Sequence, residues 1–190
     1  MTIVIDVANV MGSRPDGWWR DRAGAAVRLY DEVVSLAASG RVVLPPADDE
    51  AAPNDLGSDG PAPNDPGSDG PGSDGPGSDG PGAGEPGETG APGFVMVLEG
   101  AAKAAARRIS PPAKEDAEVT GGVAPGEVMI VLARGSGDDT IVAVARDVPG
   151  PRYVVTADRE LRRRCAAAGA RILGPGWLLG ELGRAGQAGR

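Results

Sequence analysis

The sequence predicts an α/β fold, in which a parallel sheet of about five strands lies between layers of helices. Strand-like segments alternate with helix-like segments along most of the chain, which is the order that parallel crossover connections produce. The strand-like segments are continuous apolar runs, as expected for strands that are covered on both faces. Four of these runs end in or near an acidic residue, so one pattern predicts both the fold class and a candidate site.

The first predicted strand covers residues 3–5 and ends at Asp6, and no helix is expected to begin at the next residue. Residues 11–17 are dense in turn formers and predict a loop, at whose end Asp16 can cap a helix over residues 18–38. Apolar residues recur in this helix at three- and four-residue steps and form one stripe toward the core: Trp19, Ala23, Ala26, Tyr30, Val33 and Ala37.

Two consecutive tryptophans, Trp18 and Trp19, open this predicted helix. Such residues can stack on nucleic-acid bases, but aromatic residues at the start of a helix more often pack against the core. The apolar stripe is the usual reason for this spacing, so packing is the favoured interpretation.

Residues 45–93 form a low-complexity segment in which Gly-Ser-Asp-Gly-Pro recurs. The segment holds 11 of the chain's 27 acidic residues and no lysine or arginine. Because glycine, proline, serine and aspartate dominate it, it has too few apolar side chains to offset the entropy of ordering. We therefore expect a single domain over residues 1–190, interrupted by a disordered acidic insert. A fold tolerates such an insert because loop-closure entropy grows slowly with length.

The rest of the chain repeats the strand–helix unit. Four further strands are predicted, at residues 94–98, 128–132, 153–157 and 170–173. The first of these strands leads into an alanine-rich helix at 101–108 and then a polar connection at 110–126. Each of the other three leads into a helix with an apolar face. The apolar faces carry Ile141, Val142, Val144 and Ala145 in the first of these helices, Leu161, Cys165 and Ala168 in the second, and Trp177, Leu178 and Leu182 in the third. Cys165 is interpreted as a core residue rather than a reactive thiol. Pro175 suits the first turn of the last helix, and the chain is expected to fray after Gly183.

The net charge of −8 is unevenly distributed. Outside the acidic insert, the 19 basic residues exceed the remaining 16 of the 27 acidic ones, so the body of the chain has a net charge of +3 and permits a polyanionic partner. Histidine is absent, so acid–base or metal chemistry would have to use carboxylates. The single cysteine excludes an intramolecular disulfide framework. With no signal-peptide pattern and no apolar run of membrane-spanning length, we expect a soluble cytoplasmic protein that does not bind a membrane.

Acidic residues follow the predicted strands at their carboxyl ends. They are Asp6 after the first strand, Glu99 after the second, Asp138 and Asp139 after the third, and Asp158 after the fourth. If the strands are parallel neighbours, these carboxylates meet at one edge of the sheet, where open α/β folds bind their ligands.

Taken singly, some of these residues have a structural interpretation. Asp158 can be the N-cap of the next helix, Ser136 with Asp139 resembles a capping pair, and Asn9 can simply shape a turn. Taken together, the acids favour a metal site, because clustered carboxylates repel one another unless a cation shares the site. Oxygen ligands select hard ions such as Mg²⁺ or Mn²⁺, which activate water in phosphodiester cleavage.

Three competing motifs fail at particular residues. A haloacid-dehalogenase-type phosphatase needs a second aspartate two residues after the first, and this chain has Ala8 there. A P-loop needs Gly-Lys-Ser/Thr at the end of its glycine run, but Gly137 is followed by Asp138. The dinucleotide-binding fingerprint needs three spaced glycines after a strand, and no predicted strand is followed by them.

Asp6 with Asn9, the Gly-Ser-Gly-Asp-Asp segment at 135–139 and the Thr-Ala-Asp-Arg-Glu segment at 156–160 together resemble the NYN branch of PIN-like nucleases. The resemblance implies a three-layer α/β/α PIN-like fold and a Mg²⁺- or Mn²⁺-dependent ribonuclease that hydrolyses RNA phosphodiester bonds. It implies metal binding by Asp6, Asp138 and Asp158, a ligand or water-orienting role for Asp139, and a positioning role for Asn9. Glu99 stands where many relatives carry an aspartate, and it is a further candidate ligand.

Arginines beside two of these segments are candidate phosphate contacts: Arg14, Arg20, Arg22, Arg159 and Arg162. Solvated helix faces explain these arginines equally well. Because some relatives bind RNA without cutting it, the alternative function is a non-catalytic RNA-binding or interaction module of the same fold.

Overall fold

The computed structural model describes residues 1–45, 91–109, 114–115 and 122–188. In these residues, six strands form one sheet with only parallel pairings, in the order β3-β4-β2-β1-β5-β6. The strands are β1 (Thr2–Asp6), β2 (Gly93–Leu98), β3 (Lys114–Glu115), β4 (Val128–Leu132), β5 (Arg152–Val155) and β6 (Arg171–Leu173). The predicted α/β class and parallel sheet are confirmed, and the two-residue β3 falls in the stretch expected to be a polar connection.

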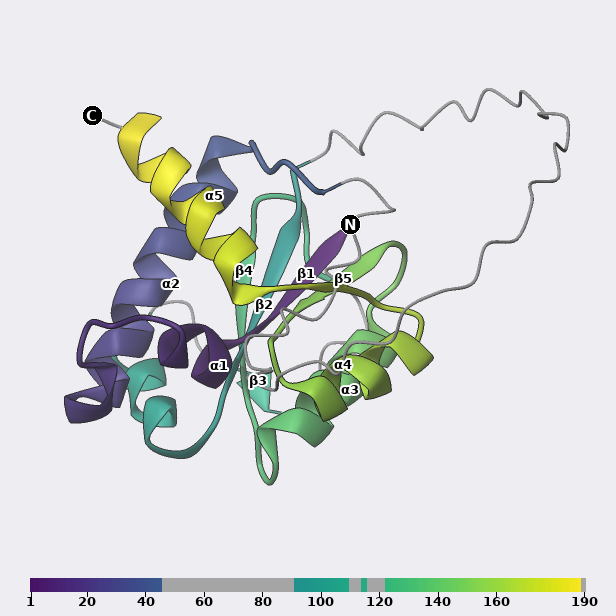
Figure 1. Ribbon diagram of the computed structural model, residues 1–190, viewed down its shortest axis with the longest axis horizontal. Helices are drawn as coiled ribbons and strands as arrows, with labels where there is room; N and C mark the ends of the chain where they lie inside the picture. Colours follow the sequence, from purple (N-terminus) through teal and green to yellow (C-terminus); the bar gives the residue numbers. More distant parts are fainter. Residues whose placement is uncertain (46–90, 110–113, 116–121, 189–190) are drawn as a thin grey trace, which may run out of the picture.

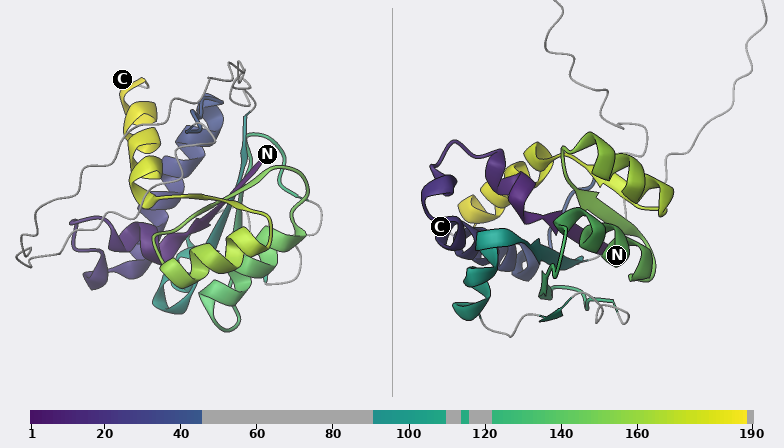
Figure 2. Two further views of the ribbon diagram at one scale, coloured as in Figure 1. Left: turned by 45° about the vertical axis from the view of Figure 1, so that its right-hand side comes forward. Right: turned by 90° about the horizontal axis from the view of Figure 1, so that it is seen from below.

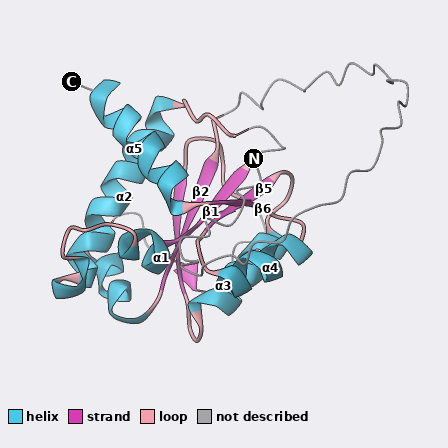
Figure 3. Ribbon diagram, viewed as in Figure 1, coloured by secondary structure: helices cyan, strands magenta, loops and turns pink. Residues whose placement is uncertain are grey.

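Helices cover both faces of the sheet, so the architecture has three layers (Figures 1, 2 and 3). The first layer contains α1, α2, α5 and the 3₁₀ helix η2, and the second contains α3 and α4. The helices are α1 (Val7–Gly12), η1 (Trp18–Arg20), α2 (Arg22–Ser39), η2 (Gly100–Arg107), α3 (Gly137–Asp147), α4 (Arg159–Ala167) and α5 (Pro175–Ala188).

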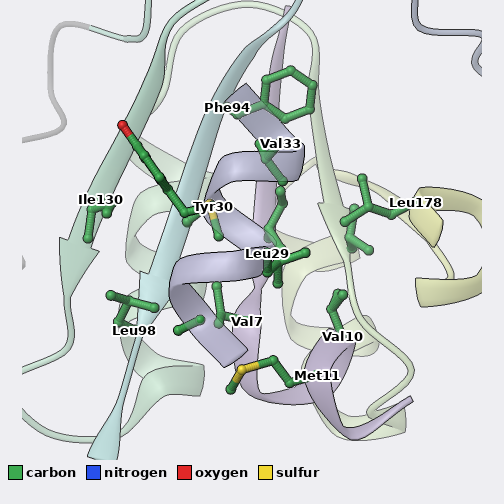
Figure 4. Close-up of a cluster of buried hydrophobic side chains, with 14 of the residues drawn as sticks. Val7, Val10, Met11, Leu29, Tyr30, Val33, Phe94, Leu98, Ile130 and Leu178 are labelled. Carbon is green, nitrogen blue, oxygen red and sulfur yellow. The ribbon is translucent and has the colours of Figure 1, made fainter. Parts of the chain in front are cut away.

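Alternate residues of the central strand point into the two layers. Ile3 and Ile5 join the apolar cluster under α1, α2, η2 and α5, whereas Val4 joins the cluster under α3 and α4. Figure 4 shows the first cluster, in which Leu29 of α2 and Phe94 of β2 take part. Because both faces of β1 are buried, its sequence is a continuous apolar run, as predicted.

The register of the sheet brings the carboxyl ends of three strands together. Asp6 at the end of β1 pairs with Val97 of β2, and Ile5 pairs with Val155 at the end of β5. The residues that follow these strands therefore lie at one edge of the sheet.

The expectation that no helix begins after Asp6 is wrong. The helix α1 begins at Val7, and the side chain of Asp6 is its N-cap, accepting a hydrogen bond from the Asn9 backbone N–H at 3.0 Å. Val10 and Met11 of this short helix are buried in the first cluster, and this contact stabilises a helix of only six residues.

The single helix expected over residues 18–38 is divided into η1 and α2. Asp16 accepts a hydrogen bond from the Trp18 backbone N–H at 3.1 Å, but it starts only the 3₁₀ turn. Asp21 is the N-cap of α2, because its side chain accepts a hydrogen bond from Gly24 N–H at 2.8 Å. As a result Trp19 lies outside the apolar stripe of α2.

The expectation that the chain frays after Gly183 is also wrong, because α5 continues to Ala188. Leu178 and Leu182 anchor this helix in the first apolar cluster. Cys165 is fully buried in the second cluster, which confirms its interpretation as a core residue.

Residues 46–90, which make up nearly all of the expected disordered insert, lie outside the described residues. The strand β2 begins at Gly93, so the C-terminal boundary of that segment lies slightly earlier than expected. Among the described residues, no helix combines the length and the apolar character needed to cross a membrane.

Candidate active site

Four carboxylates line one open hollow of about 480 Å³ at the carboxyl edge of the sheet. They come from the end of β1, the residue after β2, the first turn of α3 and the residue before α4. The hollow is lined by Asp6, Ala8, Asn9, Gly12, Ser13, Trp18, Glu99, Asp138, Ala157 and Asp158. The predicted convergence of strand-end acids therefore occurs for four of the five acids.

Asp6 is the most deeply buried of these carboxylates, with 7% of the residue exposed. Burial raises its pKa, and the negative charges of Asp138 and Glu99 raise it further. Two hydrogen bonds oppose that shift: Oδ1 accepts from the Asn9 backbone N–H at 3.0 Å, and Oδ2 accepts from the Thr156 hydroxyl at 2.9 Å. Asp6 is thus held in one orientation by partners on two different elements.

Thr156 is a site residue that the sequence analysis did not identify as one. It is only 1% exposed, and its hydroxyl both donates to Asp6 and accepts a hydrogen bond from the Asp158 backbone N–H at 3.2 Å. A buried threonine directly after an apolar strand was the available signal, because a buried hydroxyl needs partners. Thr156 therefore connects the Asp6 carboxylate to the backbone at Asp158.

Asn9 positions its neighbours in two ways. Its backbone N–H binds Asp6, while its side-chain Oδ1 accepts a hydrogen bond from the Ala157 backbone N–H at 2.9 Å. The side chain therefore fixes the connection that leads into α4. Asp158, which follows, caps α4 by accepting from Leu161 N–H at 2.7 Å, so its structural interpretation is confirmed although it also lines the hollow.

Glu99 caps α3 from a neighbouring strand. Its Oε2 accepts a hydrogen bond from the Gly137 backbone N–H at 3.0 Å, and a Cβ on Gly137 would clash with that oxygen. A side chain at this position would therefore force the Glu99 carboxylate to move. The expected capping pair of Ser136 and Asp139 is wrong, because the Ser136 side chain makes no capping hydrogen bond and Glu99 supplies the acceptor instead.

Two adjacent acids of α3 point in different directions. Asp138 lines the hollow, and its pKa is raised by burial and by the charges of Asp158 and Glu99. Asp139 does not line the hollow; its side chain is 70% exposed and forms an ion pair with Arg164 at 2.5 Å. The structure therefore does not bring Asp139 to the site that the sequence predicted for it.

None of the five arginines proposed as phosphate contacts lines the hollow. Arg14 pairs with Glu32 of α2, and Arg22 places its guanidinium 5.3 Å from the Trp18 ring centroid. Arg20 is exposed on η1. Arg159 and Arg162 line a separate hollow of about 230 Å³ between α4 and β6.

The carboxylate oxygens that line the hollow are suitable ligands for a hard cation, but their side chains are not arranged to coordinate one together. Among the residues that the structure describes, no set of three or more Asp, Glu, His or Cys side chains is arranged to hold a metal ion. Glu99 and Asp158 each have an oxygen bonded to a backbone N–H, of Gly137 and Leu161 respectively. Metal binding would therefore require these side chains to use their second oxygen or to rotate.

Comparisons of the chain with protein-family models, with curated proteins and with solved structures find no match. The resemblance to NYN-type nucleases therefore depends on the motif residues alone, and the function is inferred from the geometry of the site.

Proposed function

We propose that this protein is a metal-dependent ribonuclease that hydrolyses RNA phosphodiester bonds at the carboxyl edge of its sheet. One observation carries the proposal: four carboxylates from four separate elements line the same open hollow. Burial and then the negative charges of neighbouring carboxylates raise the pKa of Asp6 and of Asp138, and a divalent cation in the hollow would offset this repulsion.

In this proposal, Asp6, Asp138 and Asp158 bind the cation, with Glu99 as a further ligand. A bound Mg²⁺ or Mn²⁺ would neutralise this charge and lower the pKa of an attacking water. The protein's own contribution is orientation. Thr156 and the backbone of Asn9 fix Asp6, so its carboxylate does not have to be ordered when the substrate arrives.

The open form of the hollow suits a polymer better than an enclosed small molecule, because Ala157 and Asp158 at its rim are exposed. RNA is thus the proposed partner. The single cysteine is a buried free thiol, which is in keeping with the reducing cytoplasm where we place this activity.

The alternative proposal is a non-catalytic RNA-binding or interaction module. It is favoured by the capping bonds of Glu99 and Asp158, since these acids then have a complete role in folding. Cleavage that depends on a divalent cation separates the two proposals.

The decisive test compares Asp138→Asn with Asp139→Asn. Both substitutions remove one negative charge from the first turn of α3, but only Asp138 lines the hollow. We expect the wild type to cleave single-stranded RNA with Mn²⁺ and to lose all cleavage with EDTA. Asp138→Asn should lower the cleavage rate by about a hundredfold or more, which corresponds to about 2.7 kcal/mol in the barrier, whereas Asp139→Asn should stay near wild type.

Adding Asp6→Asn to Asp138→Asn should lower the rate little further, because residues that act as one unit are not additive. In the absence of metal, Asp138→Asn should melt at the same or a higher temperature than the wild type, since a repelled charge is removed. Equal cleavage rates of Asp138→Asn and Asp139→Asn would contradict the proposed site. If the wild type cleaves no RNA in the presence of a divalent cation, the ribonuclease proposal is wrong and the non-catalytic binding module is the remaining proposal.

A further inference from the structure

Two tryptophans stand beside the carboxylate hollow, on the 3₁₀ helix η1. Trp18 lines the hollow and also packs, partly buried, against the first apolar cluster. Trp19 is 57% exposed, with its ring centroid 6.3 Å from that of Trp18 and the ring planes at 84°. This edge-to-face contact is a favourable arrangement for an aromatic pair. Trp18 therefore supports Trp19, while more than half of Trp19 remains in contact with water.

Core packing accounts for Trp18 but does not account for Trp19. The whole chain has three tryptophans, two tyrosines and one phenylalanine, and all of them lie in the described residues. The other aromatic residues are buried or half-buried: Tyr30, Phe94, Tyr153 and Trp177. Trp19 is thus the aromatic side chain that folding leaves exposed in this part of the structure, and it lies next to the one that lines the site.

The turn that carries the two rings is fixed by its neighbours. Gly17 precedes η1 with a φ of 75°, a conformation that glycine adopts without strain. Asp16 accepts a hydrogen bond from the Trp18 N–H at 3.1 Å, and Asp21 ends the turn as the N-cap of α2. The backbone that carries the two rings is therefore largely set before any ligand binds, which lowers the entropic cost of binding.

Two arginines lie close to the rings, at a turn that Asp16 and Asp21 flank, and can attract the phosphate of a ligand whose flat face stacks on an indole. The Arg22 guanidinium lies 5.3 Å from the Trp18 ring centroid, and Arg20 is exposed on the same turn. A nucleotide has both properties, because its base stacks on an indole and its phosphate is attracted to arginine.

We infer that Trp19, supported by Trp18, is a stacking site for an unpaired nucleobase, and that it makes single-stranded RNA the substrate class of the carboxylate site. This inference rests on the proposed ribonuclease function and specifies its substrate. In a duplex, both faces of each base are covered by neighbouring bases, so a paired base cannot stack on Trp19 without first leaving the helix.

The test measures binding without cleavage. Tryptophan fluorescence is titrated in EDTA at low salt with a short oligoadenylate, with an abasic ribose-phosphate oligomer of the same length, and with duplex RNA of the same length. We expect the oligoadenylate to quench the fluorescence and to bind about tenfold more tightly than either control, which corresponds to about 1.4 kcal/mol. Equal affinity for the oligoadenylate and the abasic oligomer would overturn the inference.

The variants Trp19→Leu and Trp19→Tyr separate stacking from apolar contact. Trp19→Leu keeps an apolar side chain but removes the flat ring, so it should lose most of the quenching and bind the oligoadenylate about as weakly as the abasic oligomer. Trp19→Tyr should recover part of the affinity, and it keeps the test valid if the leucine variant does not fold. Trp177→Phe is the matched control, because Trp177 lies on α5 and donates its indole N–H to the Val43 carbonyl oxygen at 2.9 Å. This control should bind like the wild type.

The failure of this inference can be distinguished from the failure of the proposed function. If quenching depends on Trp19 but no Mn²⁺-dependent cleavage is found, the stacking site is supported and the ribonuclease function is contradicted. If Trp19→Leu cleaves single-stranded and duplex RNA with Mn²⁺ as fast as the wild type does, the ribonuclease function is supported and the stacking site is overturned.

Discussion

Replacing Thr156 by valine tests the geometry of the site without assuming any function. Valine has nearly the same shape, but it removes the hydroxyl that donates to Asp6 and accepts from the Asp158 N–H. A hydrogen bond to a charged group contributes about 1.5–3 kcal/mol. The second bond, from the Asp158 backbone N–H, is only part-buried and joins two uncharged groups, so its loss adds less than the loss of the bond to Asp6. We therefore expect the free energy of unfolding to fall by about 2 kcal/mol at neutral pH, and the melting temperature to fall by roughly 4–8 °C.

The loss caused by Thr156→Val should depend on pH in a defined direction. Burial already raises the folded-state pKa of Asp6 above the ordinary value of an aspartate, and the hydroxyl bond opposes that shift. Removing the bond raises the pKa further and penalises the ionised form. The penalty is fully present above the folded-state pKa of Asp6 in the variant, which is the higher of the two, and it is lost as the pH falls below the folded-state pKa of Asp6 in the wild type.

The assay is urea denaturation of the wild type, Thr156→Val and Thr156→Ser at neutral and at mildly acidic pH. The serine variant keeps the hydroxyl and loses one buried methyl group, so its cost should not change with pH. A stability loss for Thr156→Val that is the same at both pH values, or absent, would refute the role assigned to Thr156.

Three further predictions follow from particular contacts. Gly137→Ala should destabilise the protein, because the new Cβ would displace the Glu99 carboxylate. Gly183→Ala on α5 should raise the melting temperature, because its new Cβ would meet no atom outside the helix's own backbone within 4 Å. Equal effects of the two substitutions in thermal unfolding would contradict the Glu99 cap. Cys165, which is fully buried with a thiol pKa of about 11, should react with a thiol reagent at mildly alkaline pH only in denaturant, and rapid labelling of the native protein would be the contrary result. Replacing residues 46–90 by a short Gly-Ser linker should preserve a cooperative melt. It should also tighten RNA binding at low salt, because it removes 11 acidic residues that compete with RNA for the basic body of the chain. An aggregated product would show that the segment is structural.

The layered sheet could be predicted from the sequence because its signal is local. A continuous apolar run, such as that of β1, indicates a strand that is buried on both faces of the sheet. Acidic residues at the ends of such runs indicate the carboxyl edge of the sheet. The short helix α1 was missed although Val7, Val10 and Met11 have helical spacing, because a helix of six residues gives too short a pattern to separate from a loop.

The partners within the site could not be predicted because they depend on distances in space. Glu99, which follows β2, accepts a hydrogen bond from Gly137 at the start of α3, and nothing local to either residue indicates that bond. Asp138 and Asp139 are equivalent in the sequence, yet one turn of a helix holds 3.6 residues, so adjacent side chains point about 100° apart. The rotation of α3 about its axis, which its packing on the sheet sets, decides that Asp138 faces the hollow and Asp139 meets Arg164.

Capping and ligand binding are not exclusive roles for these acids, and Asp6 shows why. Its Oδ1 caps α1, but asparagine caps a helix about as well and carries no charge. An ionised aspartate that is buried beside Asp138 and Glu99 destabilises the fold, as its raised pKa indicates. The cap therefore explains an oxygen acceptor at this position but does not explain the charge. A charge that weakens the free protein becomes favourable only when a cation or another positive group enters the hollow, and this supports the proposed metal-dependent function over a purely structural one.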